Sequence, residues 1–321
     1  MRIAFVSCVC TALYPQQPVW DWIAARQPDR LLLLGDSTYF DIDSASHPRD
    51  MPDWEFAQHI YQRYAELIAQ PQFAALVGGM PPGTVHAIWD DHDFLWNDAT
   101  GGDKNTRLVH GGKIRLATVF LEAFRAALQQ QLAAGSFPPG PGDASFWNTN
   151  QPLPLTTPSL QLEPDLWLHL TDGRTNRTST FLVAESKRTV FGDAQKAAFA
   201  QAITNAPQAV HLWASGSTMA GYQRYTKDIA WLMGLAAQQR MLMLSGDIHR
   251  NALDAFTNGP NRFALHEATS SGAAVKDAVV AGAMRQNFGI LDIGPQQVDI
   301  SLFSRNRVEL SRTIFRQTWL P

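Results

Sequence analysis

Residues 85–98 read VHAIWDDHDFLWND, a short and largely apolar run that leads into three acids around a histidine. Runs of this length are typical of a buried strand. The side chains of Asp90, Asp91, His92 and Asp93 therefore follow the end of a strand, where ligands bind in open α/β sheets. Acids crowded in this way cost electrostatic free energy unless a cation balances them. The stretch predicts a metal site, and the alternative is a solvated acidic loop.

Three more apolar runs end in the same manner, at residues 4–6, 31–34 and 241–244. Side chains of metal-ligand type follow these runs: Cys8, Asp36, Tyr39, Asp247 and His249. If the four strand ends meet, a thiolate, imidazoles and anionic oxygens lie together, and they need a cation among them. We therefore predict a polynuclear metal site.

The candidate ligands differ in chemistry. Asp36 and Asp247 each follow a glycine, which permits a sharp turn, and a carboxylate can bridge two cations. Either acid alone could be a turn cap. The phenolate of Tyr39 suits Fe³⁺, and Cys8 adds a soft donor. Both could instead be ordinary buried residues.

Bulk composition bounds the class of protein. The 321 residues are 45% hydrophobic and 17% charged, with a formal net charge of −3. These values argue against a general nucleic-acid or anionic-membrane binder and leave room for a small phosphorylated substrate. No apolar run approaches the ~20 residues that span a bilayer. The chain enters its first strand without a signal peptide or twin arginine, so we expect a cytoplasmic protein without a membrane role.

The arrangement of elements indicates an α/β fold. Helices and strands alternate in the first third, and strands dominate the second half, which favours two facing mixed sheets flanked by helices. Helices are expected at residues 18–27, 53–70, 114–132 and 193–203. Strands are expected at residues 3–6, 31–34, 85–89, 160–170 in two pieces, 180–184, 209–214, 240–244, 263–268, 290–293, 298–303 and 308–315.

The Pro/Gly-rich stretch at residues 135–158 breaks regular structure. Candidate ligands lie on both sides of it, so dividing the chain there would split the site. We therefore expect residues 1–321 to form one domain, with 135–158 as a loop over the site.

The segments FVSC, GDSTY, WDDHDFLWND, TDGRTNR, FGDAQ, LSGDIH and EATSSG occur in an order that resembles the PhoD-like alkaline phosphatase/phosphodiesterase family, within the calcineurin-like metallophosphatases. The resemblance implies a four-layer α-β-β-α sandwich. It implies Fe³⁺ with Ca²⁺, or other divalent metals such as Zn, Mn, Co and Mg. By the resemblance, His92 is the catalytic histidine and Asn97 the polar residue that follows it. The implied metal ligands are Cys8, Asp36, Tyr39, Asp90, Asp91, Asp247 and His249.

The chain departs from this family at a few points. The family usually has Glu where this chain has Asp93, and the N-terminal β-domain and twin-arginine leader of many members are not seen in this sequence. These departures leave the phosphatase core and put the extracellular role of such members in doubt.

Two arginines extend the site. A guanidinium fork matches two phosphoryl oxygens, so Arg174 and Arg177 are expected to bind phosphate. Both could instead be surface residues. We also expect Glu267 to support the site from a neighbouring strand.

These residues predict a metal-dependent phosphoester hydrolase acting on monoesters, diesters or both. Cations would activate water, Arg174 would balance transition-state charge, and His92 would protonate the leaving group, with Asp91 completing the catalytic set. The alternative is a non-catalytic metal-binding or sensor protein on the same fold. The sequence leaves the native substrate and the oligomeric state open.

Overall fold

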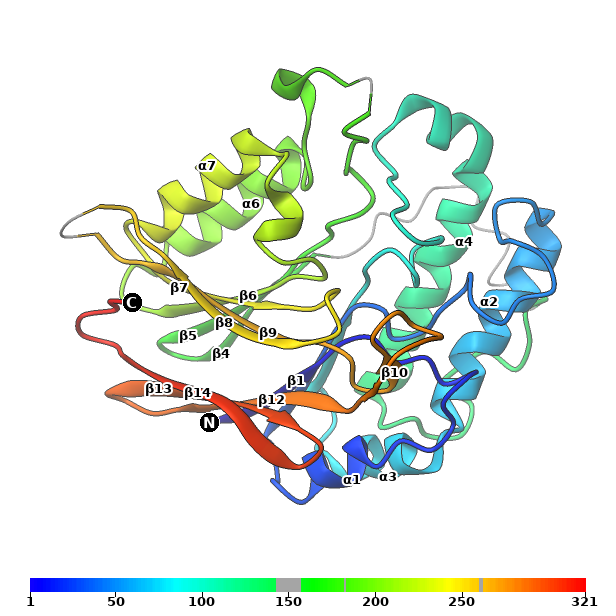
Figure 1. The fold of residues 1–321 in the computed structure, drawn as a ribbon, viewed down its shortest axis with the longest axis horizontal. Coiled ribbons are helices and arrows are strands. Elements are labelled where there is room, and N and C mark those ends of the chain that lie inside the picture. The colour runs from blue at the N-terminus through cyan, green and yellow to red at the C-terminus, as the bar shows by residue number, and fades with distance from the viewer. Residues whose placement is uncertain (143–156, 182, 260–261) are drawn as a thin grey trace.

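The computed structural model describes residues 1–142, 157–181, 183–259 and 262–321. Two six-stranded mixed sheets face one another, and helices cover their outer surfaces (Figure 1). No helix among the described residues has the length and apolar character needed to cross a bilayer.

The first sheet has the strand order β14-β13-β12-β1-β2-β3. Its parallel part is β1 (Arg2–Val6), β2 (Arg30–Leu34) and β3 (Val85–Ile88). An antiparallel extension adds β12 (Asn287–Ile293), β13 (Gln297–Ser304) and β14 (Arg307–Phe315). The helices on this side are α1 (Val19–Ala24), α2 (Asp53–Ile68), α3 (Pro71–Gly79) and α4 (Lys104–Gln129).

The second sheet has the strand order β4-β5-β6-β7-β9-β8. The four parallel strands are β5 (Leu166–Leu170), β6 (Val210–Ala214), β7 (Arg240–Ser245) and β9 (Leu265–Ser270). Antiparallel edges are β4 (Ser159–Glu163) and β8 (Asn251–Phe256). Outside lie α6 (Asp193–Thr204) and α7 (Thr226–Ala236), with the short helices η1 (Glu185–Lys187) and η2 (Ala220–Tyr222). A small hairpin joins β10 (Val275–Lys276) to β11 (Met284–Arg285).

The parallel strands in the middle of each sheet are buried on both faces, because successive side chains alternate between the helices and the facing sheet. On β1, Phe5 points into the apolar layer between the sheets, whereas Ala4 and Val6 pack toward the helices. On β7, Leu242 and Leu244 face the first sheet, and Met241 and Met243 face the helices on the other side. Apolar runs without polar alternation are the sequence mark of such doubly covered strands.

The predicted α/β architecture, two mixed sheets flanked by helices in a four-layer sandwich, is therefore confirmed. The expected helix at 114–132 is longer at its start, because α4 begins at Lys104 and continues through a kink at His110. The sequence analysis did not anticipate α3, α7 or β8.

One predicted strand is wrong. Within residues 180–184, the four described residues do not form a strand. The Arg188 guanidinium instead donates to the carbonyl oxygens of Thr180 and Val183, at 3.1 and 2.9 Å, and this holds the segment as a turn before η1. The loop predicted over the site at 135–158 lies largely outside the described residues, and residues 135–142 form turns after α4.

Candidate metal centre

The candidate ligands follow β1, β2 and β3 of one sheet and β7 of the other. Cys8, Asp36, Asp247 and His249 all have positive φ, at 62°, 50°, 75° and 50°. This left-handed region is uncommon for residues with a side chain, and such backbone strain tends to gather at functional sites. The chain therefore turns sharply at four of the predicted positions, and among these four residues Cys8 and Asp36 are in contact.

Two glycines make room for Asp90 at the junction of the sheets. A Cβ on Gly35 would lie 2.5 Å from the Asp90 backbone nitrogen, and one on Gly216 would lie 2.6 Å from the Asp90 carboxyl carbon. Neither contact is sterically allowed. Gly35 therefore permits the turn after β2 to pack on the turn after β3, and Gly216 permits the second sheet to approach Asp90.

The centre of the site is a buried triad of Asp36, Asp91 and His92, whose possible ligand atoms all lie within 4.8 Å of one another. The His92 backbone N–H donates to Asp36 Oδ1 at 3.3 Å. Asp91 Oδ2 accepts the backbone N–H of Asp98 at 2.5 Å. Asp91 Oδ1 is buried and has no hydrogen-bond partner in the described part of the chain. The Arg174 guanidinium pairs with this oxygen at 3.4 Å without a hydrogen bond, and a bound cation would stabilise the carboxylate further.

Cys8 lies against the triad. Its Sγ is 3.3 Å from Asp36 Oδ2 and 3.2 Å from Ser271 Oγ. Burial is the main cause of the raised pKa of this thiol, and the nearby Asp247 adds to it. Hydrogen bonds to neighbouring hydroxyl groups lower the pKa and offset part of this effect. A neutral thiol in this position could become a thiolate ligand only if a cation were bound nearby. Cys8 and Cys10 are both free and buried.

Tyr39 and His249 form the next contact. Tyr39 Oη is 3.2 Å from His249 Nε2, and the ring of Tyr39 packs on that of His92 with centroids 4.3 Å apart. The other nitrogen of His249, Nδ1, lies 2.9 Å from the carbonyl oxygen of Asp277. A histidine donating Nδ1–H to a carbonyl has Nε2 free as a ligand atom, the arrangement common for metal-bound histidines.

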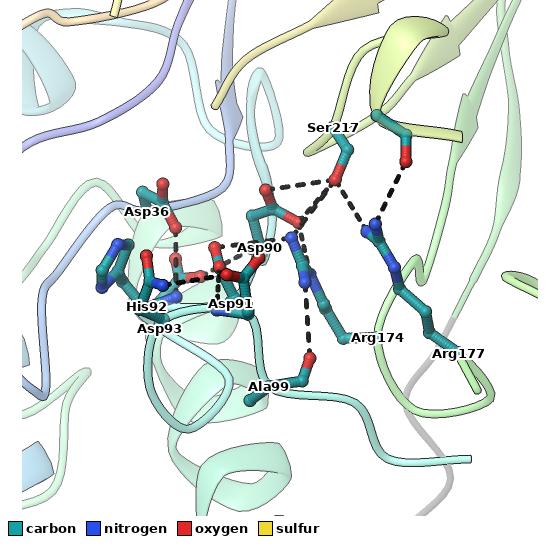
Figure 2. Close-up of polar contacts among 12 residues, drawn as sticks. Asp36, Asp90, Asp91, His92, Asp93, Ala99, Arg174, Arg177 and Ser217 are labelled. Carbon is teal, nitrogen blue, oxygen red and sulfur yellow. Dashed lines mark hydrogen bonds and ion pairs between the residues drawn. The ribbon is translucent and has the colours of Figure 1, made fainter. Parts of the chain in front are cut away.

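A buried ion-pair network borders the triad (Figure 2). Arg174 Nε lies 2.6 Å from Asp90 Oδ1, and Arg174 Nη2 lies 3.4 Å from Asp91 Oδ1. Ser217 Oγ accepts from Arg174 Nη2 at 3.2 Å and from Arg177 Nη1 at 2.9 Å. Arg174 is therefore occupied by the acids, whereas Arg177 contacts only neutral groups among the described residues.

Asp93 holds the backbone of the acidic loop. Its two carboxylate oxygens accept the N–H groups of Ser37 and Asp90 at 2.8 and 2.7 Å. Burial, partly offset by these bonds, raises its pKa to about 7. Asp93 thus ties the turn after β3 to the turn after β2, and brings Asp36 and Asp91 together.

The charge states differ sharply within the centre. Burial is the largest cause of the raised pKa of Asp36, and Cys8 and Asp91 add to it. Burial also opposes ionisation of Asp91, but Arg174 and His92 outweigh it and lower the pKa. The pKa of Asp247, which is half-buried near Asp90 and Asp91, rises to about 7 mainly through burial. Acids that resist ionisation together are those that a bound cation would stabilise.

His92 is oriented by Asp41, a residue that sequence reasoning missed. His92 Nδ1 lies 2.6 Å from Asp41 Oδ1, and the backbone N–H of Asn97 donates to Asp41 Oδ2 at 2.8 Å. Burial lowers the pKa of His92, but the Asp41 bond and the nearby Asp36 and Asp91 overcome it and raise the pKa to about 10. The side chain of Asn97 is turned to Asp98, at 3.1 Å.

Glu267 lies behind the site on β9. Its Oε1 accepts from Ser245 Oγ at 2.7 Å and from the Met219 backbone N–H at 3.0 Å. These bonds join the end of β7 to the segment after β6, and so they fix the turn that carries Asp247. Ser217 and Gly216 lie in that same segment, and neither carries a spacing signal in the sequence.

Comparisons with known proteins show the fold. No protein-family model and no curated protein matches the chain. A solved structure of PhoD is 14% identical, covers 98% of this chain and 70% of its own, and superposes with a TM-score of 0.64. A predicted phosphoesterase of Streptococcus pneumoniae TIGR4 is 9% identical over 98% of each chain, with a TM-score of 0.34. Wild-type Vps29 of Entamoeba histolytica in complex with Zn is 8% identical, covers 98% of this chain and 99% of its own, and has a TM-score of 0.34.

The first of these likenesses defines the class of fold. The two facing mixed sheets with helices outside, and the similarity to PhoD, make this a metallophosphatase-like α/β fold. Within that fold, the buried triad of Asp36, Asp91 and His92 is a group suited to metal binding.

Proposed function

We propose that the protein is a metal-dependent hydrolase of phosphate esters, acting on monoesters, diesters or both. The observation that carries the proposal is the buried meeting of Asp36, Asp91 and His92, in which Asp91 Oδ1 has an ion pair to Arg174 but no hydrogen bond among the described residues. The metallophosphatase-like fold places this group at the ends of strands, where such folds bind ligands.

The donor set fits a site for more than one cation. Asp36 lies between the Cys8 thiol and the His92 backbone, so its two oxygens face different neighbours. The mixture of a thiol, a phenol, carboxylates and an imidazole suits Fe³⁺ beside a harder divalent ion such as Ca²⁺. Zn, Mn, Co or Mg could replace either. Proposed ligands are Cys8, Asp36, Tyr39, Asp90, Asp91, Asp247 and His249.

For Asp90, a bound cation would compete with groups of the protein that already contact its carboxylate. Its Oδ1 already pairs with Arg174 and accepts from Ser217 Oγ at 3.3 Å. Arg174 is fully enclosed and makes further bonds to Ser217 and to the Ala99 carbonyl oxygen. We therefore assign Arg174 the task of balancing the charge of Asp90 and Asp91, and leave the contact with phosphoryl oxygens chiefly to Arg177.

Bound cations would supply charge stabilisation and an activated water. The chain's own groups supply the rest. Asp41 accepts Nδ1–H of His92, which leaves Nε2 to carry a proton toward the leaving oxygen of the ester. Arg177 offers donors to the phosphoryl oxygens, and Asn97 stands at the exposed rim beyond Asp41. Both sheets contribute to the site, so we treat residues 1–321 as one functional unit with a small phosphorylated substrate.

The test measures bound metal and phosphoesterase activity in the same protein samples. Protein purified without chelator is assayed for bound metals and for hydrolysis of p-nitrophenyl phosphate and bis(p-nitrophenyl) phosphate. We expect Asp91→Asn to lose metal and activity together, because it removes a buried negative charge from the proposed ligand set. Asp21→Asn, at an exposed acid on α1, is the control and should retain both.

Two outcomes would contradict the proposal. Full activity in a metal-free, chelator-treated sample would exclude a metal-dependent hydrolase. Stoichiometric metal with no turnover on any monoester or diester would favour the sensor or metal-binding alternative. Phenolate or thiolate bonded to Fe³⁺ gives a visible absorption band, so active protein without iron or colour would point to divalent ions alone.

A further inference from the structure

A polar cavity of about 420 Å³ lies beside the ion-pair network. Its lining includes three guanidinium groups, from Arg174, Arg177 and Arg224. The hydroxyl-bearing residues Thr180 and Tyr225 line the same space. The cavity therefore gathers hydrogen-bond donors and positive charge in one place.

Within the described part of the chain, the positive charge of this cavity is balanced only in part. Arg174 pairs with Asp90 and Asp91, but no carboxylate among the described residues lies within ion-pair distance of Arg177 or Arg224. The acid in the lining is Asp98, which is exposed. An excess of cations is notable in a chain whose formal net charge is −3. Clefts lined by one sign of charge attract ligands of the opposite sign.

Hydrogen bonds to neutral groups orient the Arg177 guanidinium and leave some of its N–H groups unused. Its Nε, Nη1 and Nη2 contact Tyr225 Oη at 3.2 Å, Ser217 Oγ at 2.9 Å and the Gly221 carbonyl oxygen at 3.3 Å. The guanidinium also lies over the ring of Tyr225, 5.2 Å from its centroid. These bonds fix the fork and use three of its five N–H groups, which leaves donors for a ligand. A donor that is already ordered costs less entropy when it binds.

The cavity adjoins the proposed metal centre. Ser217 Oγ bonds to both Arg174 and Arg177 and lies 3.3 Å from Asp90 Oδ1, so one hydroxyl links the acids to the cavity (Figure 2). A phosphoester at the acids would extend its alcohol part past Arg174 into this space. Arg224 lines the same cavity, and its Nη1 lies 3.4 Å from Thr180 Oγ1.

We propose that this cavity is a subsite for a second phosphate group of the substrate, bound chiefly by Arg224, with Arg177 between this phosphate and the reacting one. The inference rests on the proposed function and narrows its substrate class to small bisphosphorylated molecules. Arg224 is the residue that sets this specificity, because its guanidinium is exposed and has no ion pair to any carboxylate among the described residues.

Binding is measured first, without catalysis. Chelator-treated protein is titrated with inorganic phosphate by calorimetry. We expect measurable affinity that falls as salt is raised, and about a tenfold or greater loss in Arg224→Gln, the effect of losing one charged hydrogen bond. The control is Lys187→Gln, which removes the same charge from an exposed residue of the neighbouring η1 outside the cavity, and it should bind phosphate like the parent protein.

Hydrolysis is measured second, on butanediol monophosphate and butanediol bisphosphate. We expect Arg224→Gln to raise KM for the bisphosphate more than for the monophosphate. The subsite would be overturned if the parent protein bound no phosphate, or if Arg224→Gln bound phosphate with the same affinity as the parent protein. Hydrolysis with KM ratios that Arg224→Gln does not alter would overturn the subsite and leave the proposed function standing. Phosphate binding that depends on Arg224 in a protein that hydrolyses no ester would instead defeat the proposed function alone.

Discussion

Replacing Gly216 by alanine tests how tightly the two sheets meet at Asp90. The added methyl would lie 2.6 Å from both the carboxyl carbon and Oδ1 of Asp90, well inside van der Waals contact. Asp90 is buried and bonded to Arg174, so it has no free space into which it can move. Either the Asp90–Arg174 pair separates or the segment after β6 shifts.

The size of the effect follows from these two routes. Overpacking a tight site costs about 1–3 kcal/mol. Breaking a buried ion pair costs about 3–5 kcal/mol. We therefore expect Gly216→Ala to lower the free energy of unfolding by about 2–4 kcal/mol and to weaken metal binding, because Arg174 also faces Asp91.

Urea denaturation monitored by tryptophan fluorescence, together with metal analysis, measures both effects. The matched control is Gly111→Ala within α4, where an added Cβ meets nothing within 4 Å. That change should stabilise the protein slightly, by up to about 1 kcal/mol, since alanine favours the helix. If Gly216→Ala retained the stability of the parent protein, the crowding argument would be refuted.

Two further predictions concern buried histidines. His169 Nε2 lies 3.0 Å from His211 Nδ1, and burial lowers their pKa values to about 3 and about 4, so both stay neutral when folded. Because the unfolded chain takes up protons below pH ~6.5, the stability given by each neutral ring is present above that pH and is lost on acidification, by about 2 kcal/mol between pH 7 and pH 5. The stability difference between parent and His211→Leu should shrink by that amount over this range, and a constant difference would disprove it. For His92, Asp41→Asn should lower kcat by about 100-fold on alkyl phosphates and much less on p-nitrophenyl phosphate, whose leaving group needs no proton; equal losses on both would show that Asp41 has a merely structural part.

The fold was predictable because its strands are covered on both faces. Uninterrupted apolar runs such as residues 31–34 and 241–244 indicate strands that are buried on both faces. Because ligands bind at the carboxyl ends of such strands, the runs also indicated where Asp36 and Asp247 would lie. The strand expected at 180–184 failed because its extended pattern is overruled by Arg188, whose bonds to backbone carbonyls are tertiary contacts.

Three residues of the site, Asp41, Ser217 and Gly216, were not predicted, because their roles also depend on tertiary contacts. Asp41 contacts His92 through the geometry of a loop, and Ser217 joins two arginines from a turn that no periodicity marks. Gly216 matters only because Asp90 comes from the opposite sheet. These roles arise from contacts between distant segments, and the sequence around each residue looks ordinary.

The positive φ angles at Cys8, Asp36, Asp247 and His249 have a consequence for how the centre is acquired. Local preference opposes these turns, so only the completed packing of both sheets maintains them. A synthetic peptide spanning residues 245–250 would relax to ordinary angles and bind metal ions no more tightly than its free side chains allow. Cations would accordingly load after the chain has folded, and mild denaturation would release them while most helices persist.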